Sequence, residues 1–443
     1  MNERQATQTL RLNPQPLPPG LARRNLPRIA DTAFTSRAST FEMLEEARVR
    51  PRPVQPRIVS SAHGPLTHLL FTYPAYADGE FSYQAVYADL FAKLPATTRF
   101  TILTHPDVAA DLEEALAEAS AGDRATIVEA PDFLNFLVWA EDPYVVVHDM
   151  AQDPPTVFLI EPFTFPRAGD ASIADLIAEA TDIQGMQSPL YFQGGNLLIG
   201  DDFVLIGADY PARTLDLIQR GSPILVPPGM QAARFIRELY QRTFDPDRRV
   251  LYAGTRLPVF AAEQQTIVIG GEPWVERLYE GTGTAQPIFH IDMFISLAGR
   301  GASGEYRLLV GSPAEAGRIL AQPTPAHAMA EIFDDVARQL QRQGFEVIRN
   351  PLPITYVDDP VNRERMWYFA TSNNCLVQID DQAGNQVWLP TYGHDPWADL
   401  AATDAANKRI WEELGFEVHQ LADFNPFAQN LGAVHCIKKY LER

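Results

Sequence analysis

The chain has 443 residues, of which 46% are hydrophobic, and its formal net charge is -20. This length and hydrophobic content exclude a mostly disordered protein and predict a sizeable core. The negative charge argues against nucleic acid or an anionic membrane as the main partner and is compatible with a cationic small molecule or peptide. Two cysteines are too few for a disulfide scaffold, so we expect free thiols in a reducing compartment.

Segments that would direct the chain into or across a membrane are not evident. No run approaches the roughly 20 apolar residues that span a bilayer. The start of the chain lacks the apolar region of a signal peptide, because prolines and an arginine interrupt residues 11–19. We therefore expect a cytoplasmic protein with no membrane partner, and a homo-oligomer is compatible with the sequence.

Residues 1–57 differ in composition from the rest of the chain. They contain ten arginines, five acidic residues and eight prolines. This composition predicts a mostly extended segment, which its positive charge could hold against the acidic remainder. We expect residues 1–57 to be an N-terminal extension and residues 58–443 to form a single domain.

From residue 65 onward, apolar strand patterns alternate with helical patterns, as in an α/β protein. Helices are predicted over 83–94, 108–119 and 231–243. Strands are predicted over 67–72, 99–104, 144–148, 157–160, 197–199, 203–206 and 250–253.

The last third of the sequence contains an internal repeat. Helices are predicted over 329–344 and 405–415, and each ends at a glycine, Gly344 or Gly415, that is followed by Phe-Glu-Val. Glycine permits the left-handed turn that ends a helix, so each copy predicts a helix followed by a strand. The glycines lie 71 residues apart (415 minus 344), so about five such units would fit in residues 58–443. Five units around an axis would make a closed propeller, but a doubly wound sheet would also alternate helices with strands.

The apolar run 287–295 contains His290 and Asp292. On a strand, side chains two residues apart share a face, and burying two polar groups there is costly unless each has a partner. The pair could be a histidine satisfied by its neighbour, or two ligands of a metal. No other His or Asp spacing completes a metal set, so we expect no metal or cofactor and favour a functional pair.

Two other stretches carry weaker signals. The glycine pair Gly194 and Gly195 opens a predicted strand and would let a ligand approach the backbone, although such pairs are more often plain turns. Asp142 lies three residues after Trp139, where a solvated loop is the commoner explanation.

The two cysteines have different surroundings. Cys436 follows two small residues, Gly432 and Ala433, that would allow a close approach, which makes it the candidate nucleophile. That role requires thiolate character, which a nearby imidazolium could supply. Cys375 enters an apolar run, so we expect it to be buried and inert.

Taken together, these stretches resemble the motifs of the guanidino-group-modifying enzymes, the pentein superfamily, which includes arginine, agmatine and peptidyl-arginine deiminases and amidinotransferases. The resemblance spans roughly residues 65 to 443, and an ordered set of motifs is far more specific than any single one. The matching segments are Trp139 to Asp142 (W-x-x-D), Gly194-Gly195-Asn196 (G-G-N), His290 to Asp292 (H-x-D), Asn373-Asn374 and His435-Cys436.

The resemblance implies a fivefold pseudosymmetric α/β-propeller and a hydrolase of the deiminase type. Cys436 would attack the guanidino carbon, and His290 would act as general acid and base. An amine in place of water would make the same site an amidinotransferase. The residues implied to bind the substrate are Asp142, Asp292, Gln193, Gly194, Gly195 and Asn196.

Two positions depart from the family pattern. Gln193 stands where many members carry glutamate, and Glu141 stands where agmatine deiminases carry arginine. A small cationic guanidine compound and an arginine-containing peptide both stay open as substrates, and so does a non-catalytic propeller used as a binding module. Arg213, Arg300 and Arg307 could bind a substrate carboxylate, although ordinary surface arginines are commoner.

Overall fold

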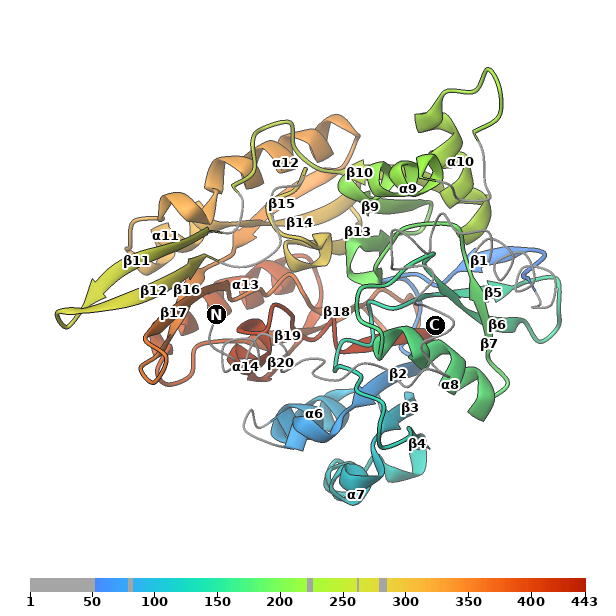
Figure 1. Ribbon diagram of the computed structural model, residues 1–443, viewed down its shortest axis with the longest axis horizontal. Helices are drawn as coiled ribbons and strands as arrows, with labels where there is room; N and C mark the ends of the chain where they lie inside the picture. The colour runs from blue at the N-terminus through green and yellow to red at the C-terminus, as the bar shows by residue number, and fades with distance from the viewer. Residues whose placement is uncertain (1–51, 79–82, 221–225, 261–262, 279–284) are drawn as a thin grey trace.

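The computed structural model describes residues 52–78, 83–220, 226–260, 263–278 and 285–443. In these residues the chain forms several small sheets covered by helices, so the expected α/β class is confirmed (Figure 1). Most of the predicted N-terminal extension lies outside the described residues.

Within the described part of the chain, five sheets share one pattern of strand pairing. A first strand pairs antiparallel with a second, and the second pairs parallel with a third. Two of the sheets add a fourth strand at an edge. The five sheets are β21 (Lys438–Glu442), β2 (His68–Tyr73), β3 (Arg99–Thr104) and β4 (Ala125–Glu129); β1 (Pro56–Ile58), β5 (Val145–Asp149), β6 (Thr156–Glu161) and β7 (Gln184–Gln187); β8 (Leu197–Ile199), β9 (Phe203–Gly207) and β10 (Arg249–Ala253); β13 (Ile295–Arg300), β14 (Tyr306–Ser312) and β15 (Glu346–Pro351); and β18 (Leu376–Gln378), β19 (Gln386–Thr391) and β20 (Glu417–Asp423).

Helices occupy the crossovers between the parallel strands of these sheets. Parallel neighbours cannot be joined by a tight turn, so each second strand is followed by a helical connection to the third. The helices are α6 (Tyr83–Lys93), α7 (Ala109–Glu118), α8 (Ile173–Ala180), α9 (Asp209–Gln219), α10 (Ala232–Phe244), α11 (Pro313–Leu320), α12 (Ala330–Arg342) and α13 (Ala401–Glu413), with the short α14 (Asn425–Ala428) after β20.

The internal repeat is confirmed. Helix α12 ends before Gly344 and leads into β15, and α13 ends before Gly415 and leads into β20. Both glycines have positive φ, 95° and 88°, a conformation that disfavours other residues. The third strand of each sheet pairs parallel with the second, so the two copies are equivalent units.

A further four-stranded sheet lies outside this pattern, and the sequence patterns did not reveal it. Its strand order is β11 (Glu263–Ile269), β12 (Glu272–Leu278), β17 (Glu364–Phe369) and β16 (Ile354–Asp359). The β11–β12 hairpin extends away from the body of the molecule at the left of Figure 1. Its turn is Gly270-Gly271, where both φ values are positive, as two-residue hairpins require.

The strand predicted through His290 and Asp292 is wrong. A single 3-10 turn occupies Ile291–Met293, and β13 begins only at Ile295. The backbone N–H of Ile291 donates to Asn196 Oδ1 at 3.0 Å rather than to a neighbouring strand. The side chain of Asn196 therefore takes the hydrogen bond that a neighbouring strand would accept in a sheet.

The last strand lies inside the molecule. Strand β21 pairs with β2, and all but its last residue are buried. The guanidinium of Arg443 donates to backbone oxygens of Ser61, Ala62, Gly64 and Val377, which ties the end of this strand to the segment between β1 and β2 and to β18. Cys436 lies two residues before β21, so its position is fixed by a buried strand.

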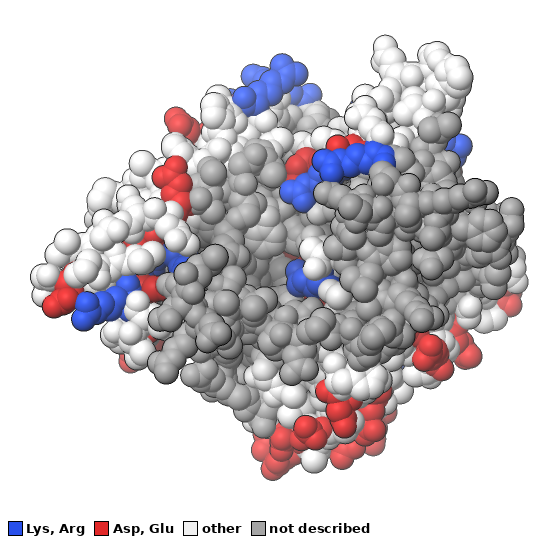
Figure 2. All heavy atoms as spheres, in the orientation of Figure 1, with Lys and Arg blue, Asp and Glu red and all other residues white. Residues whose placement is uncertain are grey.

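The acidic excess is visible at the surface. Figure 2 shows acidic side chains gathered at the lower edge of the molecule, where α7 lies in Figure 1. The exposed acids of this helix include Glu113, Glu114 and Glu118. Among the helices of the described residues, none has the length and apolar content needed to cross a membrane.

The boundary of the N-terminal extension can be tested by deletion. Strand β1 pairs with β5, and the side chain of Ile58 is 2% exposed in the core. Removing residues 1–51 should leave the free energy of unfolding unchanged, because this Pro-rich composition offers little to bury. Removing residues 1–58 should lower it by about 2 kcal/mol or more, since a buried side chain is lost. Urea unfolding of the two proteins measures both values, and equal loss from both deletions would contradict this boundary.

Candidate active site

The turn that carries Cys436 is built around the amide of Asn374. Asn374 Oδ1 accepts from the backbone N–H groups of Ala433, His435 and Cys436 at 3.1, 2.9 and 3.2 Å. Its Nδ2 lies 3.2 Å from Cys436 Sγ and donates to the sulfur. One amide therefore fixes both the backbone and the thiol.

Asp292 lies on the other side of the thiol. Its Oδ2 is 3.7 Å from Cys436 Sγ and accepts a hydrogen bond from His435 Nδ1 at 2.9 Å. Burial raises the pKa of Asp292 well above its ordinary value, and the carboxylates of Asp142 and Glu141 raise it further. Burial also lowers the pKa of His435, so this imidazole is neutral and donates from Nδ1.

His290 is held by Gln193. His290 Nε2 lies 2.8 Å from Gln193 Oε1, and because an amide oxygen only accepts, Nε2 carries the hydrogen. The other nitrogen, Nδ1, is 3.5 Å from Asp142 Oδ1. Burial lowers the pKa of His290 to about 4, so at neutral pH the imidazole is uncharged and Nδ1 can accept a proton.

An arginine of the protein already occupies one oxygen of Asp142. Arg167 donates from Nη2 to Asp142 Oδ2 at 2.7 Å and from Nε to Asp170 Oδ2 at 2.6 Å. Asp142 Oδ1 is buried and forms no hydrogen bond within the described residues. Arg167 was not predicted, because nothing in its local sequence indicates a partner 25 residues away.

Gly195 is the point where the polar groups meet. A Cβ atom at this position would lie 2.6 Å from His290 Nδ1, 3.1 Å from Asp292 Oδ2 and 3.2 Å from Asp142 Oδ1. Gly194 is equally constrained, because its Cβ would collide with the carbonyl oxygen of Glu141. The glycine pair thus makes room for three converging side chains, which a plain turn would not require.

Asn196 is engaged entirely within the protein. Its Nδ2 donates to Asp209 Oδ1 at 3.1 Å, and its Oδ1 accepts from Gln286 Nε2 at 2.8 Å as well as from the N–H of Ile291. It is 0% exposed. These contacts hold the backbone between His290 and Asp292 in place.

The surroundings of Cys436 do not favour the thiolate that its expected role as nucleophile requires. Burial raises its pKa well above the ordinary value, and the carboxylates of Asp292 and Asp142 raise it further. Since His290 and His435 are both neutral, neither supplies the positive charge that a thiolate needs. The expectation that Cys375 is buried is confirmed, since it is 3% exposed, and this burial raises its pKa to about 12.

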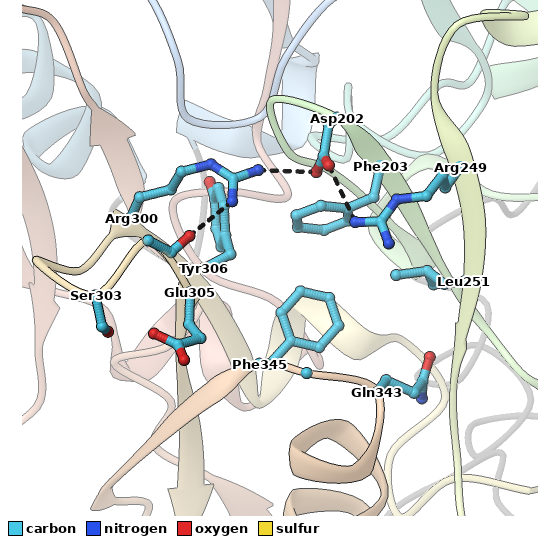
Figure 3. A pocket seen from close by; sticks show the side chains of 12 residues that line it. Asp202, Phe203, Arg249, Leu251, Arg300, Ser303, Glu305, Tyr306, Gln343 and Phe345 are labelled. Carbon is cyan, nitrogen blue, oxygen red and sulfur yellow. Dashed lines mark hydrogen bonds and ion pairs between the residues drawn. The ribbon is translucent and has the colours of Figure 1, made fainter.

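The three arginines considered for a substrate carboxylate lie in different places. Arg300 lines a separate cavity of about 350 Å³, where it pairs with Asp202 at 3.1 Å (Figure 3). Arg307 donates to the backbone oxygen of Ala298. Arg213 lies on α9. The same helix carries Tyr210, whose ring centroid is 6.5 Å from that of the His290 imidazole. In the part of the chain that the structure describes, no three His, Cys, Asp or Glu residues could hold a metal ion.

The neutral state of His290 predicts a pH-dependent stability. Above pH 6.5 the imidazole is neutral in both the folded and the unfolded chain; as the pH falls from 6.5 towards 4, only the unfolded chain binds the proton. The folded protein should therefore lose about 2 kcal/mol at pH 5 relative to His290→Gln. Urea unfolding of both proteins at pH 7 and pH 5 measures this difference, and parallel losses would show that His290 is not held neutral.

No protein-family model matches the sequence, and no curated protein matches it. Among solved structures, a candidate peptidyl-arginine deiminase superimposes with a TM-score of 0.57 and 13% identity, covering 88% of this chain and 99% of the other. The agmatine deiminase of Enterococcus faecalis gives 0.56 and 14%, covering 87% and 95%. That of C. jejuni gives 0.56 and 11%, covering 88% and 97%.

Identities this low establish a shared fold and leave the reaction to be argued from the site. The likeness agrees with the resemblance drawn from the ordered motifs: the chain has the same fold as these deiminase structures.

Proposed function

We propose that the protein is a deiminase-type hydrolase of guanidino compounds, which releases ammonia and leaves a ureido product. The observation that carries this proposal is the convergence of His290 Nδ1, Asp292 Oδ2 and Asp142 Oδ1 beside Gly195, with the Cys436 thiol 3.7 Å from Asp292. A thiol, an imidazole and two carboxylates are the groups that nucleophilic chemistry at a cationic carbon needs.

Two unpartnered carboxylate oxygens account for substrate binding. Asp142 Oδ1 and Asp292 Oδ1 are buried, and neither forms a hydrogen bond within the described residues. A buried acceptor without a donor is costly, more so when it is charged. A guanidinium is planar and carries N–H donors along its edges, so it can satisfy both carboxylates with charge-assisted hydrogen bonds. Because Arg167 already donates to Asp142 Oδ2, only Oδ1 of Asp142 is left for the substrate.

The substrate's charge also activates the thiol. In the ligand-free site, burial and two carboxylates keep Cys436 protonated. A guanidinium bound between Asp142 and Asp292 places a positive charge beside the sulfur and lowers the pKa of Cys436. Recognition of a cation is therefore coupled to formation of the nucleophile.

The proton moves through His290. The thiol proton passes to His290 Nδ1 as the Cys436 sulfur bonds to the guanidino carbon. The imidazolium, facing Asp142 Oδ1, returns that proton to the departing nitrogen; the C–N bond breaks, ammonia leaves and a thiouronium remains on Cys436. His290 then takes a proton from water, whose oxygen attacks the same carbon. The C–S bond breaks, His290 returns its proton to the sulfur, and the hydroxyl proton on the former guanidino carbon passes to solvent, where the released ammonia takes it up, as the neutral ureido product leaves.

Gln193 makes His290 suitable for this task. Because Gln193 Oε1 accepts from Nε2–H, the lone pair of His290 lies on Nδ1, the nitrogen that faces the reacting groups. A glutamate at this position would favour the imidazolium in the resting enzyme. The neutral amide keeps the imidazole ready to accept the thiol proton.

We further propose that the five equivalent sheets are the blades of a pseudo-fivefold propeller, formed by residues 58–443 as one catalytic domain. Support comes from the shared pairing pattern of the sheets and from the fold likeness to deiminases. The site residues come from four of these sheets or the segments leading into them, as expected for a site near a common axis.

Ammonia release tests the reaction. The purified protein should release ammonia from at least one of arginine, agmatine, methylated arginines or arginine-containing peptides. Asp142→Asn and Asp292→Asn should each lower kcat/KM by about 100-fold, because each loses a charge-assisted hydrogen bond worth about 3 kcal/mol. Cys375→Ala is the matched control for Cys436→Ala and should keep most activity.

Two other outcomes would reject the hydrolase. Transfer of the amidino group to an added amine without ammonia would identify an amidinotransferase. Guanidine binding without turnover, unchanged in Cys436→Ala, would identify a binding module.

Alkylation separates the two cysteines without any substrate. Chloroacetamidine is a cation that resembles a guanidinium, and chloroacetamide is its neutral counterpart. Cys436 should react at least about tenfold faster with the amidine, because the two carboxylates bind the cation and its charge favours the thiolate. Cys375 should be slow with both. Peptide mass mapping after brief exposure gives the four rates, and equal reactivity of Cys436 towards the two reagents would remove the substrate-assisted step.

A further inference from the structure

A buried ion cluster lies immediately behind the site, and the proposed mechanism does not use it. Glu141 is 4% exposed, and each of its carboxylate oxygens bonds to a different lysine: Oε2 to Lys438 Nζ and Oε1 to Lys439 Nζ, both at 2.8 Å. Lys438 is 0% exposed and Lys439 is 5% exposed. Full enclosure of three charges is costly unless they are paired and hydrogen-bonded, as these are.

The cluster joins the two segments whose separation matters for the reaction. Glu141 is next to Asp142 in sequence, and the lysines follow Cys436 by two and three residues. The backbone adds to the link: Glu141 N–H donates to the carbonyl oxygen of Cys436 at 3.0 Å, and Lys439 Nζ donates to the carbonyl oxygen of Glu141 at 3.0 Å. The segment of Asp142 and the segment of Cys436 are thus held together by four polar contacts.

The same cluster adjusts the charge of the site. Two lysines against one glutamate leave an excess positive charge near Asp142 and Asp292. Although burial alone would raise it, the lysines lower the pKa of Glu141 to about 2, so this carboxylate is charged throughout the working range of pH. Lys438 also opposes the rise in the pKa of Asp292 that burial causes. An ionised Asp292 is the form that binds a guanidinium.

We propose that Glu141, Lys438 and Lys439 are positioning residues for the reaction at Cys436. Their ion cluster sets the carboxylate of Asp142 at a fixed distance from the thiol, and it places the positive charge of Lys438 and Lys439 beside the site. The inference rests on the proposed function, because it assigns the cluster to guanidinium binding and attack. It also accounts for Glu141: a positive residue at this position would leave both buried lysines without a counter-charge.

The decisive comparison separates positioning from stability. In Glu141→Leu/Lys438→Met/Lys439→Met the three charges are replaced by apolar side chains of similar volume, an exchange that often leaves stability unchanged or higher. We expect this triple variant to keep its melting temperature but to lose about 100-fold in kcat, with a smaller change in KM, because small displacements of reacting groups cost about that much. Asp245→Asn is the matched control, since it breaks a buried ion pair with Arg248 in another part of the fold. It should lower the melting temperature and leave kcat/KM unchanged.

A second measurement does not depend on turnover. The measured quantity is a ratio of two rates for Cys436: its alkylation rate with chloroacetamidine divided by its alkylation rate with chloroacetamide. In wild-type protein this ratio reports how well the carboxylates hold a cation beside the thiol. This ratio should fall at least about tenfold in Glu141→Gln and in Lys438→Met. In Lys438→Met its pH profile should also move to higher pH, since Asp292 then ionises later. Lys438→Arg, which keeps the charge, should restore the wild-type profile.

The outcomes distinguish this inference from the proposed function. If wild-type protein releases no ammonia from any guanidine compound, the proposed function fails, while the alkylation ratio still decides the role of the cluster. If the folded triple variant has the wild-type kcat, the cluster serves only the stability of the fold, and the inference is overturned. If the triple variant does not fold, an unchanged alkylation ratio and pH profile in Glu141→Gln and Lys438→Met would overturn it equally.

Discussion

The structure depends on enclosing several carboxylates in one small region and compensating their charge. Asp142, Asp292 and Glu141 are each less than 5% exposed, a burial that isolated charges would not tolerate. Arg167 compensates Asp142, and the lysine pair of β21 compensates Glu141. Among the described residues, no Lys or Arg pairs with Asp292, which accepts a hydrogen bond from the neutral imidazole of His435. The site is therefore left with one carboxylate for which a cation is missing, and a guanidinium substrate has the charge to complete it.

This arrangement explains why the nucleophile is placed at the start of an internal strand. Cys436 needs a position that does not shift when a cation enters, and β21 provides it because its first four residues are buried and it pairs with β2. Asn374 then fixes the turn that precedes the strand through three backbone hydrogen bonds. The same amide also donates to Cys436 Sγ, so the rigidity of the turn and the environment of the thiol depend on one side chain.

The sequence indicated the residues that gather at the candidate site better than it indicated their surroundings. Cys436, His290, Asp142 and the glycine pair could be named from ordered motifs, and the structure brings them together. The helices and strands with clear periodicity were placed to within a few residues, because local patterns determine them. What was missed depends on pairing between distant segments: Arg167 reaches Asp142 only after the chain has folded. The strand expected at His290 failed for the same reason, since Asn196, 95 residues away, takes the hydrogen bond that would have defined it.

Gln193 illustrates how one uncharged side chain can set the direction of proton transfer. The amide oxygen of Gln193 accepts the hydrogen bond from His290 Nε2–H without adding a negative charge. The basic nitrogen of His290 is therefore Nδ1, which lies where Asp142 and Asp292 converge. The imidazole is buried, and without an anion bonded to Nε2 it stays neutral until a proton arrives from the thiol. Once protonated, it lies 3.5 Å from Asp142 Oδ1, the oxygen that Arg167 leaves free. In the proposed reaction, the charge that develops on His290 is therefore met by a carboxylate already in place, which lowers the barrier to the first proton transfer.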